Sequence, residues 1–308
     1  MTAPMVIVAG EALVDLVPRG DALWPSAAGS PVNVAVGLGR LGVATAFCGT
    51  VSTDGFGDLI ATRLDDAGVA LDLLTPVGLP TTLAVVHLDA EGRASYGFYL
   101  DGTSADGLTP DSLPSLPENA ALHVSFGAIG PTTVPAGEAL VHLIEREAGH
   151  RVVSLDPNVR PSAIDDLTAT VARLEAAVAA SDVVKASDED LAALHPGVAP
   201  EEVAARWAGS GPALVVVTLG PDGAVAFGAA GRTEIPGRQV EVVDTVGAGD
   251  AFTAGLLGHL AGAGLLDREA LRAIDADATT AALEHAVRVA AITCTRTGAD
   301  PPTAADVG

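Results

Sequence analysis

The sequence of 308 residues contains little cysteine, few aromatic residues and little positive charge. Its two cysteines, Cys48 and Cys294, lack the spacing of a metal site, so we expect buried, reduced thiols and a cytoplasmic location. Aromatic residues make up only 3% of the chain, and much of its apolar content is alanine. No apolar run is long enough to span a bilayer, and the first residues lack the basic region of a signal peptide.

Positive charge is scarce, because 16 lysines and arginines stand against 39 acidic residues, for a formal net charge of -23. This balance disfavours nucleic acid or an anionic membrane as a partner. An anionic small molecule would have to be held by backbone N–H groups, a helix N-terminus, a metal ion and a few local cations. A hydrophobic fraction of 49% still indicates a folded protein rather than a disordered acidic chain.

Short apolar segments alternate with longer helical ones along most of the chain. This pattern predicts a three-layer α/β/α body around a mostly parallel sheet, with residues 1–308 forming one domain. The predicted strands are 6–10, 44–51, 121–126, 151–155, 182–185, 213–219, 223–228, 233–235 and 239–243. The predicted helices are 31–41, 56–67, 134–148, 167–180, 188–194, 248–260 and 279–293.

Two segments depart from this alternation. Residues 13–26 are followed by no helix of their own, and the apolar runs 82–88 and 94–100 flank a turn at 89–92, as in a β-hairpin. We expect residues of about 13–28 and 81–104 to form a small antiparallel sheet that closes over a ligand as a lid. Its exposed edge could pair with a second copy, which predicts a homodimer through the lid.

The stretch DTVGAGDAF at 244–252 follows a predicted strand and opens a helix. Gly247, Ala248 and Gly249 allow a tight turn and leave N–H groups uncovered at the positive end of the helix, which makes a site for an anion. Asp250 lies beside that site and could take a proton from a hydroxyl that attacks a phosphoryl group. A capped helix with an acidic first turn explains the same residues equally well.

The same stretch resembles the C-terminal signature of the PfkB, or ribokinase-like, carbohydrate kinases. The family's other signature is similar to AGSPVNVA at 28–35, which is followed by Gly39, Gly42 and Gly49. The two signatures stand in the family order, and the predicted layout matches the family from end to end. The resemblance implies an ATP-dependent transfer of the γ-phosphoryl group to a sugar hydroxyl, with ATP and Mg²⁺ as cofactors and K⁺ as a further candidate.

The resemblance implies a role for each residue that matches a family motif. Asp250 is the expected base, with Gly247, Ala248 and Gly249 as the anion hole. The expected sugar-binding residues are Asp15, Gly29, Asn33, Phe98 and Arg160. The expected nucleotide-binding residues are Lys185, Ser187, Thr218, Gly220, Gly223, Gly249 and His285. Taken alone, Asp15 is more typical of a solvated strand end, Asn33 of a helix cap and His285 of a packed or exposed helix residue.

Ser187 and Asp190 stand where the family usually carries an Asn-x-x-Glu motif that organises Mg²⁺ through water. Aspartate is a shorter oxygen ligand that still suits Mg²⁺, although a solvated helix start explains the segment as well. Asp244 matches the region where family members bind a monovalent cation. TLGPDG at 218–223 resembles the family's turn beside the nucleotide phosphates, and an ordinary Pro-Asp-Gly turn is locally as good.

The acceptor sugar is predicted from four segments that are similar to fructokinase-like members, 10–15, 125–130, 156–160 and 184–188. Arg160 could clamp a carboxylate, which keeps 2-keto-3-deoxygluconate open beside ribose or a nucleoside, or it could pair with the acidic surface. Outside the enzymes, the alternative is a sugar-binding regulator on the same fold. GLGRLG at 37–42 fits a dinucleotide fingerprint but lies late in a predicted helix, which is the wrong context for it.

Overall fold

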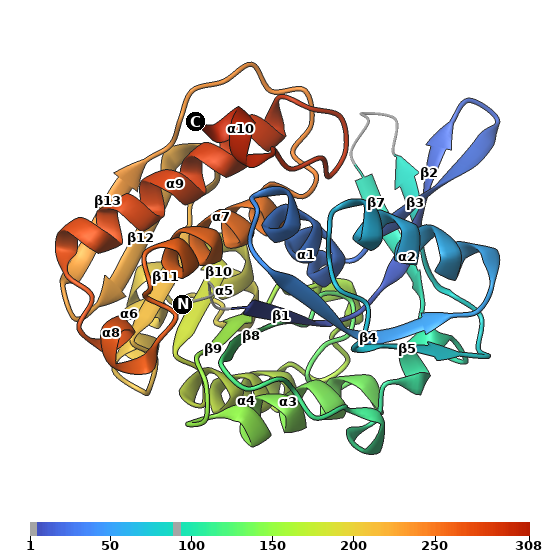
Figure 1. Cartoon of the computed structure of the whole chain (residues 1–308), viewed down its shortest axis with the longest axis horizontal. Coiled ribbons are helices and arrows are strands. Elements are labelled where there is room, and N and C mark those ends of the chain that lie inside the picture. The colour runs from blue at the N-terminus through green and yellow to red at the C-terminus, as the bar shows by residue number, and fades with distance from the viewer. Residues whose placement is uncertain (1–4, 89–93) are drawn as a thin grey trace.

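The computed structural model describes residues 5–88 and 94–308, and the predicted turn at 89–92 lies outside them. Its large sheet has the strand order β13-β12-β11-β10-β9-β8-β1-β4-β5 (Figure 1). The strands are β1 (Met5–Gly10), β4 (Thr45–Ser52), β5 (Leu74–Val77), β8 (Ala120–Ser125), β9 (Val153–Asp156), β10 (Val183–Ser187), β11 (Leu214–Thr218), β12 (Gly223–Gly228) and β13 (Gly231–Pro236). From β11 to β5 in this order, each strand runs parallel to its neighbours. Strands β12 and β13 pair antiparallel at one edge. The prediction of a mostly parallel sheet is therefore confirmed.

Helices cover both faces of the large sheet, so its strands are apolar on both sides. One face carries α3 (Ala136–Glu147), α4 (Leu167–Ala179), α5 (Asp188–Leu194) and α6 (Pro200–Ala208). The other carries α1 (Ser30–Arg40), α2 (Gly55–Asp66), α7 (Ala248–Gly262), α8 (Arg268–Arg272) and α9 (Ala276–Cys294), and α10 (Ala304–Val307) follows. Small residues let these helices approach closely, since a Cβ on Gly255 of α7 would lie 2.9 Å from the Cα of Ala286 in α9.

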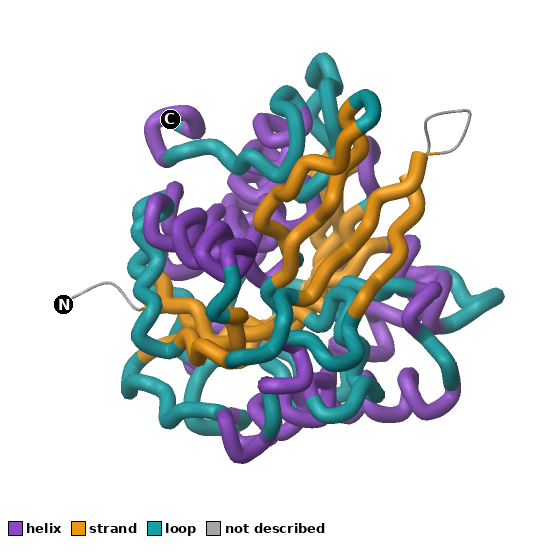
Figure 2. Tube along the Cα trace, turned by 90° about the vertical axis from the view of Figure 1, so that its right-hand side faces the viewer, coloured by secondary structure: helices purple, strands orange, loops and turns teal. Residues whose placement is uncertain are grey.

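A second, four-stranded sheet rises beside the large one (Figure 2). Its order is β3 (Ala22–Ala28), β2 (Leu13–Arg19), β6 (Thr82–Leu88) and β7 (Ala94–Tyr99). The β6–β7 pair is antiparallel, as predicted for the hairpin of 82–88 and 94–100. The β2–β3 pair is an antiparallel hairpin that was not predicted, and β2 and β6 pair in parallel. The expectation of a fully antiparallel small sheet was therefore wrong. The two hairpins belong to separate excursions of the chain, so no tight turn forces them into antiparallel order.

Other local predictions also differ from the structure. Residues 239–243 form no strand, and the side chains of Val242 and Val243 are both 59% exposed. Strand β5 and the helices α6 and α8 were not predicted. In β5 the sequence LTPV contains a proline that conceals an edge strand, and α6 is rich in alanine and charged residues rather than in large apolar ones.

The strand order places a crevice at the centre of the large sheet. Strand β1 has β4 on one side and β8 on the other, so the direction of winding reverses here. Ligands of open α/β sheets bind outside the carboxyl ends of the strands at such a switch point. Gly10 ends β1 directly opposite Ser125 at the end of β8, which predicts a site above these two residues.

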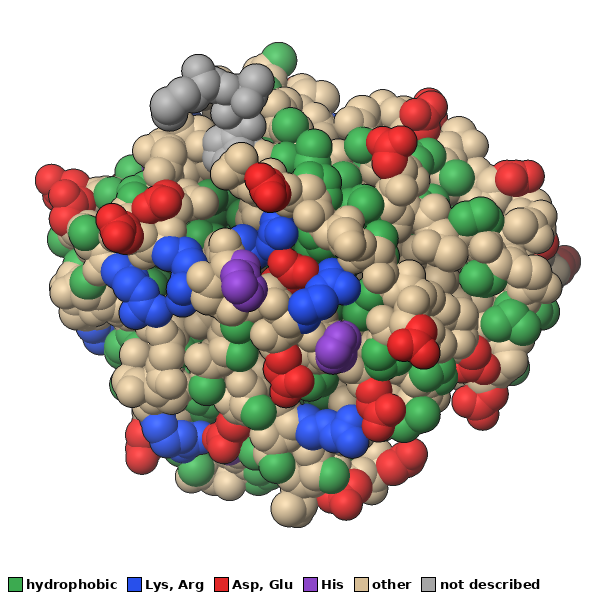
Figure 3. Space-filling view, turned by 60° about the horizontal axis from the view of Figure 1, so that its bottom comes forward, with side chains coloured by type: hydrophobic (Ala, Val, Ile, Leu, Met, Phe, Trp, Pro, Cys, Tyr) green, Lys and Arg blue, Asp and Glu red, His purple; other side chains and the backbone are tan. Residues whose placement is uncertain are grey.

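Charged side chains of both signs are mixed on the face formed by α3 and α4 (Figure 3). Glu147 accepts from Arg146 at 2.8 Å and from Arg151 at 2.6 Å, so these cations are neutralised locally. Within the described ranges, no helix combines the length and the apolar character needed to cross a membrane.

Candidate active site

Asp250 lies in the first turn of α7, and the start of α1 holds its carboxylate. Ser30 Oγ donates to Oδ1 at 2.7 Å, and Asn33 Nδ2 donates to Oδ2 at 2.7 Å. Ser30 Oγ also lies 2.8 Å from Ser125 Oγ, at the end of β8. The structure thus brings the stretches 28–35 and 244–252 together at the switch point, and each carboxylate oxygen keeps a second lone pair for a ligand.

The turn before Asp250 exposes the N-terminus of α7. Gly247 has a φ of +76° and packs closely against the chain, because a Cβ there would lie 2.6 Å from the Cβ of Ala299. In the described parts of the chain, no side chain caps this helix end. A Cβ on Gly249 would lie 3.3 Å from Lys185 Nζ, so a cation sits directly beside the turn. Helix end and ammonium together make a site for negative charge.

Lys185 is held by a buried ion pair with Asp156 at the end of β9. Its Nζ donates to Asp156 Oδ2 at 3.0 Å, and the two side chains are only 7% and 1% exposed. Burial opposes the charge of Lys185, but Asp156, Asp190 and Asp250 outweigh it and raise its pKa. Burial also raises the pKa of Asp156 to about 6. Both groups are therefore ionised at pH 7, and the positive charge beside α7 is fixed in place.

Asp15 faces the same region from the small sheet. It lies on β2 directly opposite Ser26 of β3. Burial raises the pKa of Asp15 to about 6, while Arg63 and Arg160 lower it and Asp250 raises it. Asp15 on β2 and Asp250 in the first turn of α7 are therefore within electrostatic reach of each other, and the charge of Arg160 acts on Asp15 as well.

Gly29 and Asn33 fit a close approach of a polar ligand. Gly29 has a φ of +103°, and a Cβ there would lie 2.9 Å from the carbonyl oxygen of Glu11, so only glycine suits the position. Asn33 is 8% exposed, and its Oδ1 has no hydrogen-bond partner among the residues described. Because a buried, unpartnered acceptor is costly, a ligand hydroxyl at this atom would satisfy it.

Phe98 and Arg160 come from different parts of the fold, the second sheet and the segment after β9. Phe98 of β7 packs against the small cluster of Leu13, Ala28 and Ala84 at the base of the second sheet. Arg160 follows β9 and donates to the carbonyl oxygen of Val159 at 3.2 Å. Its charge lowers the pKa of the buried Glu11 and of Asp15 against the effect of burial, so its influence is directed at the crevice.

Three of the expected nucleotide-binding residues lie at the end of β11 and in the turn that follows it. Thr218 ends that strand, and Gly220 and Gly223 bound the turn that leads into β12, with φ angles of +54° and +107°. A Cβ on Gly223 would lie 2.1 Å from the carbonyl oxygen of Ile235, so this glycine is required by packing. Among residues 5–88 and 94–308, no neighbour lies within 4 Å of the corresponding position on Gly220, which leaves the turn open at that point.

His285 lies on α9 at the opposite end of α7 from Asp250. Its ring centroid is 5.6 Å from that of His259, in the last turn of α7, and burial, His259 and Arg288 lower its pKa. Nine residues of helix separate His259 from Asp250, which corresponds to roughly 13 Å. His285 therefore lies well away from the turn at Gly247–Gly249, and its predicted role in nucleotide binding stays a prediction.

The carboxylates of the two expected metal-binding residues both accept hydrogen bonds from backbone N–H groups. Asp190 Oδ1 accepts from Val159 N at 2.8 Å, and its Oδ2 accepts from Ser187 N at 2.9 Å within a capping box. Asp244 Oδ1 accepts from Val246 N at 3.0 Å, and its Oδ2 accepts from Gly298 N at 2.8 Å. The described residues contain no cluster of three potential metal ligands.

Several residues of the site were not predicted individually. Glu11, directly after β1, accepts from Ala128 N at 3.0 Å and Ile129 N at 2.9 Å, and burial raises its pKa to about 7. Asp156 is the last residue of β9, and Ser30 lies inside the stretch 28–35. Acidic residues at the carboxyl ends of neighbouring parallel strands were the signal that could have identified Glu11 and Asp156.

Comparison with known proteins agrees with this geometry. The family model described as pfkB family carbohydrate kinase matches residues 4–305. A fructokinase of Rhizobium leguminosarum bv. trifolii is 39% identical over 89% of this chain and 85% of its own length, and one of Klebsiella pneumoniae is 36% identical over 87% and 88%.

The crystal structure of a fructokinase with bound ATP from Xylella fastidiosa superposes with a TM-score of 0.90 at 28% identity, covering 98% of this chain and 96% of that one. An aminoimidazole riboside kinase of Salmonella enterica, complexed with aminoimidazole riboside and an ATP analogue, reaches 0.81 at 28% identity over 96% and 95%. The chain therefore belongs to the PfkB family of carbohydrate kinases.

Proposed function

We propose that this chain is an ATP-dependent fructokinase with Asp250 as its catalytic base. The observation that carries the proposal is the meeting of Asp250 with Ser30 and Asn33 where α7 begins, beside the fixed charge of Lys185. The fructokinases among the similar sequences support fructose as the acceptor, and the similar structure with bound ATP supports the donor.

In the proposed reaction, Asp250 accepts the proton of the sugar hydroxyl as its oxygen attacks the γ-phosphorus. A new oxygen–phosphorus bond forms, the bond between the γ-phosphorus and the bridging oxygen breaks, and ADP leaves. The N–H groups at the start of α7, at Gly247, Ala248 and Gly249, stabilise the charge in transfer. Lys185 adds a cation beside that turn, which helps an acidic protein to bind a polyanion.

The sugar would bind between the two sheets. Asp15 and the unpartnered Oδ1 of Asn33 supply hydrogen-bond acceptors for its hydroxyls, while Gly29 lets the backbone approach closely. Arg160 supplies donors from the opposite wall, and Phe98 supplies an apolar surface.

The nucleotide would extend from the start of α7 across the carboxyl ends of β10 and β11. Its phosphates would lie near Lys185, and Thr218 and the open turn at Gly220 would follow them. His285 is placed for the base. Ser187 and Gly223 complete the proposed set by shaping the two turns.

Mg²⁺ bound with the nucleotide would neutralise phosphate charge, and Asp190 would hold it through water, since its carboxylate already accepts two backbone N–H groups. We place a monovalent cation such as K⁺ beside Asp244, whose carboxylate joins the turn before α7 to Gly298. A similar fructokinase of Vibrio cholerae is described with potassium bound, which supports this assignment.

We further propose that residues 13–28 and 81–104 form a lid on a single-domain body, and that the lid mediates a homodimer. Leu23, Trp24 and Tyr99 on the second sheet are 50%, 53% and 60% exposed. These exposed apolar side chains lie on the two edge strands, β3 and β7, and an exposed edge strand can pair with another chain. The buried thiol of Cys48, whose pKa burial raises to about 11, is consistent with the cytoplasm.

A second acceptor class is favoured by one observation, the similarity to a structure that binds aminoimidazole riboside. Arg160 keeps an acidic sugar such as 2-keto-3-deoxygluconate as a third alternative. The test is a screen of fructose, ribose, aminoimidazole riboside and 2-keto-3-deoxygluconate with ATP, Mg²⁺ and K⁺, read as ADP formed. We expect the highest kcat/KM with fructose. A higher value with another acceptor would replace fructose, and calorimetric sugar binding without ADP would indicate a regulator instead.

A further inference from the structure

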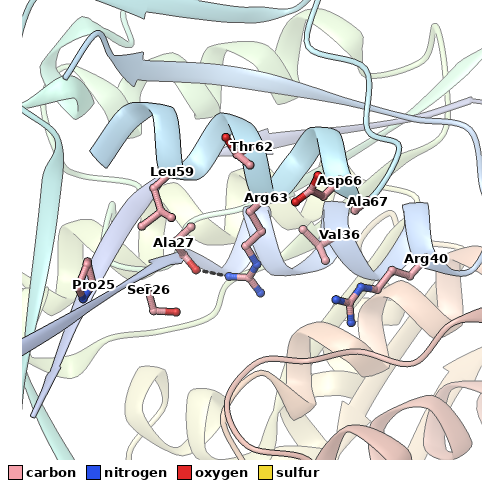
Figure 4. Close-up of a pocket in the computed structure, with 10 residues that line it drawn as sticks. All are labelled: Pro25, Ser26, Ala27, Val36, Arg40, Leu59, Thr62, Arg63, Asp66 and Ala67. Carbon is pink, nitrogen blue, oxygen red and sulfur yellow. Dashed lines mark hydrogen bonds between the residues drawn. The ribbon is translucent and has the colours of Figure 1, made fainter. Parts of the chain in front are cut away.

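Arg63 of α2 joins two backbone segments that are far apart in the sequence. Its guanidinium donates through Nη1 to the carbonyl oxygen of Ala27 in β3. Through Nη2 it donates to the carbonyl oxygen of Ala299, after α9, at 2.7 Å. Figure 4 shows the side chain reaching from α2 to the Ala27 carbonyl at the edge of a pocket of about 360 Å³. A planar guanidinium can hold two acceptors in one rigid geometry.

The Ala27 carbonyl connects Arg63 to the proposed sugar side. Ala27 lies in β3, next to Ser26, which pairs directly with Asp15 of β2. Two residues further on, Gly29 begins the turn into α1, and Ser30 of that helix donates to Asp250. The position of this carbonyl therefore determines how the second sheet joins the residues that hold the base.

The Ala299 carbonyl connects Arg63 to the proposed phosphoryl side. Ala299 packs against the turn before α7, because a Cβ on Gly247 would lie 2.6 Å from the Ala299 Cβ. The preceding residue, Gly298, donates its N–H to Asp244 at 2.8 Å, which fixes the same segment to the same turn. A displacement of Ala299 would thus be transmitted to the N–H groups that are proposed to receive the phosphoryl group.

The charge of Arg63 acts on the same two places. Burial and the neighbouring Arg40 lower the pKa of Arg63, whereas Asp250, Asp15 and Asp300 act to raise it. After burial, Arg63 has the largest effect on the pKa of Asp15, and it keeps that carboxyl more acidic than burial alone would allow. The side chain therefore lies within electrostatic reach of both the proposed sugar-binding carboxylate and the proposed base.

We propose that Arg63 is a positioning residue for phosphoryl transfer, which holds the second sheet in register with the turn that begins α7. This role rests on the proposed kinase function. Arg63 lies in the last turn of α2, outside both signature stretches. Only its hydrogen bonds to the carbonyl oxygens of Ala27 and Ala299 point to a role in the site.

Arg40 offers a matched control on the facing helix α1. It lines the same pocket and also holds the C-terminal segment, through Asp300 and the carbonyl oxygen of Pro301. Within the described part of the chain, it makes no hydrogen bond to β3. Replacing either arginine by methionine removes one charge and two hydrogen bonds at a half-buried site. Their effects on folding should therefore be similar, and their effects on catalysis should differ.

The experiment compares Arg63→Met and Arg40→Met in steady-state kinetics with fructose and ATP. We expect Arg63→Met to lower kcat by about 10- to 100-fold and to raise the KM for fructose, because small misplacements of reacting groups cost about this much. The KM for ATP should change by less than about 3-fold, and Arg40→Met should keep kcat within about 3-fold of wild type, as expected for a partly exposed ion pair. Thermal unfolding of both variants measures the shared structural effect.

The pH profile separates a positioning role from general loss of structure. The groups that act on Asp15 are Arg63, Arg160 and Asp250, with Glu11 and Tyr96 nearby. Arg63→Met should move the acid limb of kcat/KM for fructose to higher pH. Arg63→Lys keeps the charge but cannot hold two carbonyl groups in one rigid geometry. It should therefore lower kcat but move the acid limb less than Arg63→Met does. The same variant tests the proposal if Arg63→Met does not fold.

The outcomes distinguish this proposal from the proposed function. A wild-type chain that phosphorylates no sugar would refute the kinase function itself. An active wild type with unchanged kcat in Arg63→Met, or with an equal loss in Arg40→Met, would refute only the positioning role of Arg63.

Discussion

Replacing Asp250 by asparagine should remove the base and leave the architecture of the site intact. Ser30 can still donate to the asparagine oxygen. The Asn33 side chain, whose Oδ1 has no partner within the described residues, can turn that oxygen toward the new amide. The turn places Asn33 Nδ2 where Oδ1 stood, and a sugar hydroxyl can accept from this amide as well as donate. The substitution therefore removes the proton acceptor, and we expect sugar and ATP to bind with affinities close to those of wild type.

The expected loss follows from the contribution of a positioned base, about 10²- to 10⁴-fold in kcat, or roughly 3–5 kcal/mol of barrier. Turnover is measured as ADP formed in a coupled assay, and binding is measured by calorimetry with fructose and with ADP. Ser30→Ala serves as the control, because it removes one donor to Asp250 but keeps the base.

Ser30→Ala should cost less than Asp250→Asn, about 10-fold, as for one hydrogen bond to a charged group. Near-normal turnover in Asp250→Asn would show that another group takes the proton. An equal loss in the two variants would show that Asp250 acts through its geometry and not as a base.

Three further changes test other parts of the site. Asp15→Asn should raise the KM for fructose by about 10-fold or more, because a charged acceptor is lost; an unchanged KM would remove Asp15 from the sugar site. Lys185→Met should lower the free energy of unfolding by about 3–5 kcal/mol in urea titrations, since it leaves Asp156 buried without its partner. Adding Asp156→Asn should restore part of that loss, and no recovery would mean that the pair does not account for it. Glu11 has a folded-state pKa raised to about 7, so its contribution to stability is present below pH 4.5 and is lost as the pH rises toward 7. The thermal midpoint should therefore fall less steeply over this range in Glu11→Gln, and identical slopes would contradict the assignment.

The alternation of strands and helices could be predicted because buried strands such as β1 and β11 carry runs of branched apolar residues. The strand predicted at 213–219 corresponds to β11, Leu214–Thr218, and the helix predicted at 248–260 corresponds to α7. The parallel pairing of β2 with β6 could not be predicted, because it depends on how two distant hairpins meet and not on either sequence. A proline likewise concealed β5.

The candidate site was predictable where its functional groups lie close together in the sequence. Glycines before an acidic residue at a helix start identify the region of Asp250 from sequence, since the N–H groups and the carboxylate belong to one turn. The hydrogen bond from Ser30 joins residues 220 positions apart, and no local pattern encodes it. The same holds for Arg63, which is an ordinary helix residue until its two acceptors are known.

Phosphorus NMR of the purified wild-type protein with fructose, ATP, Mg²⁺ and K⁺ tests the central claim most directly, because it follows the transferred group itself. The account predicts a new phosphomonoester signal that grows in step with ADP and depends on the sugar. ADP accompanied by inorganic phosphate alone, or an unchanged ATP spectrum, would contradict it.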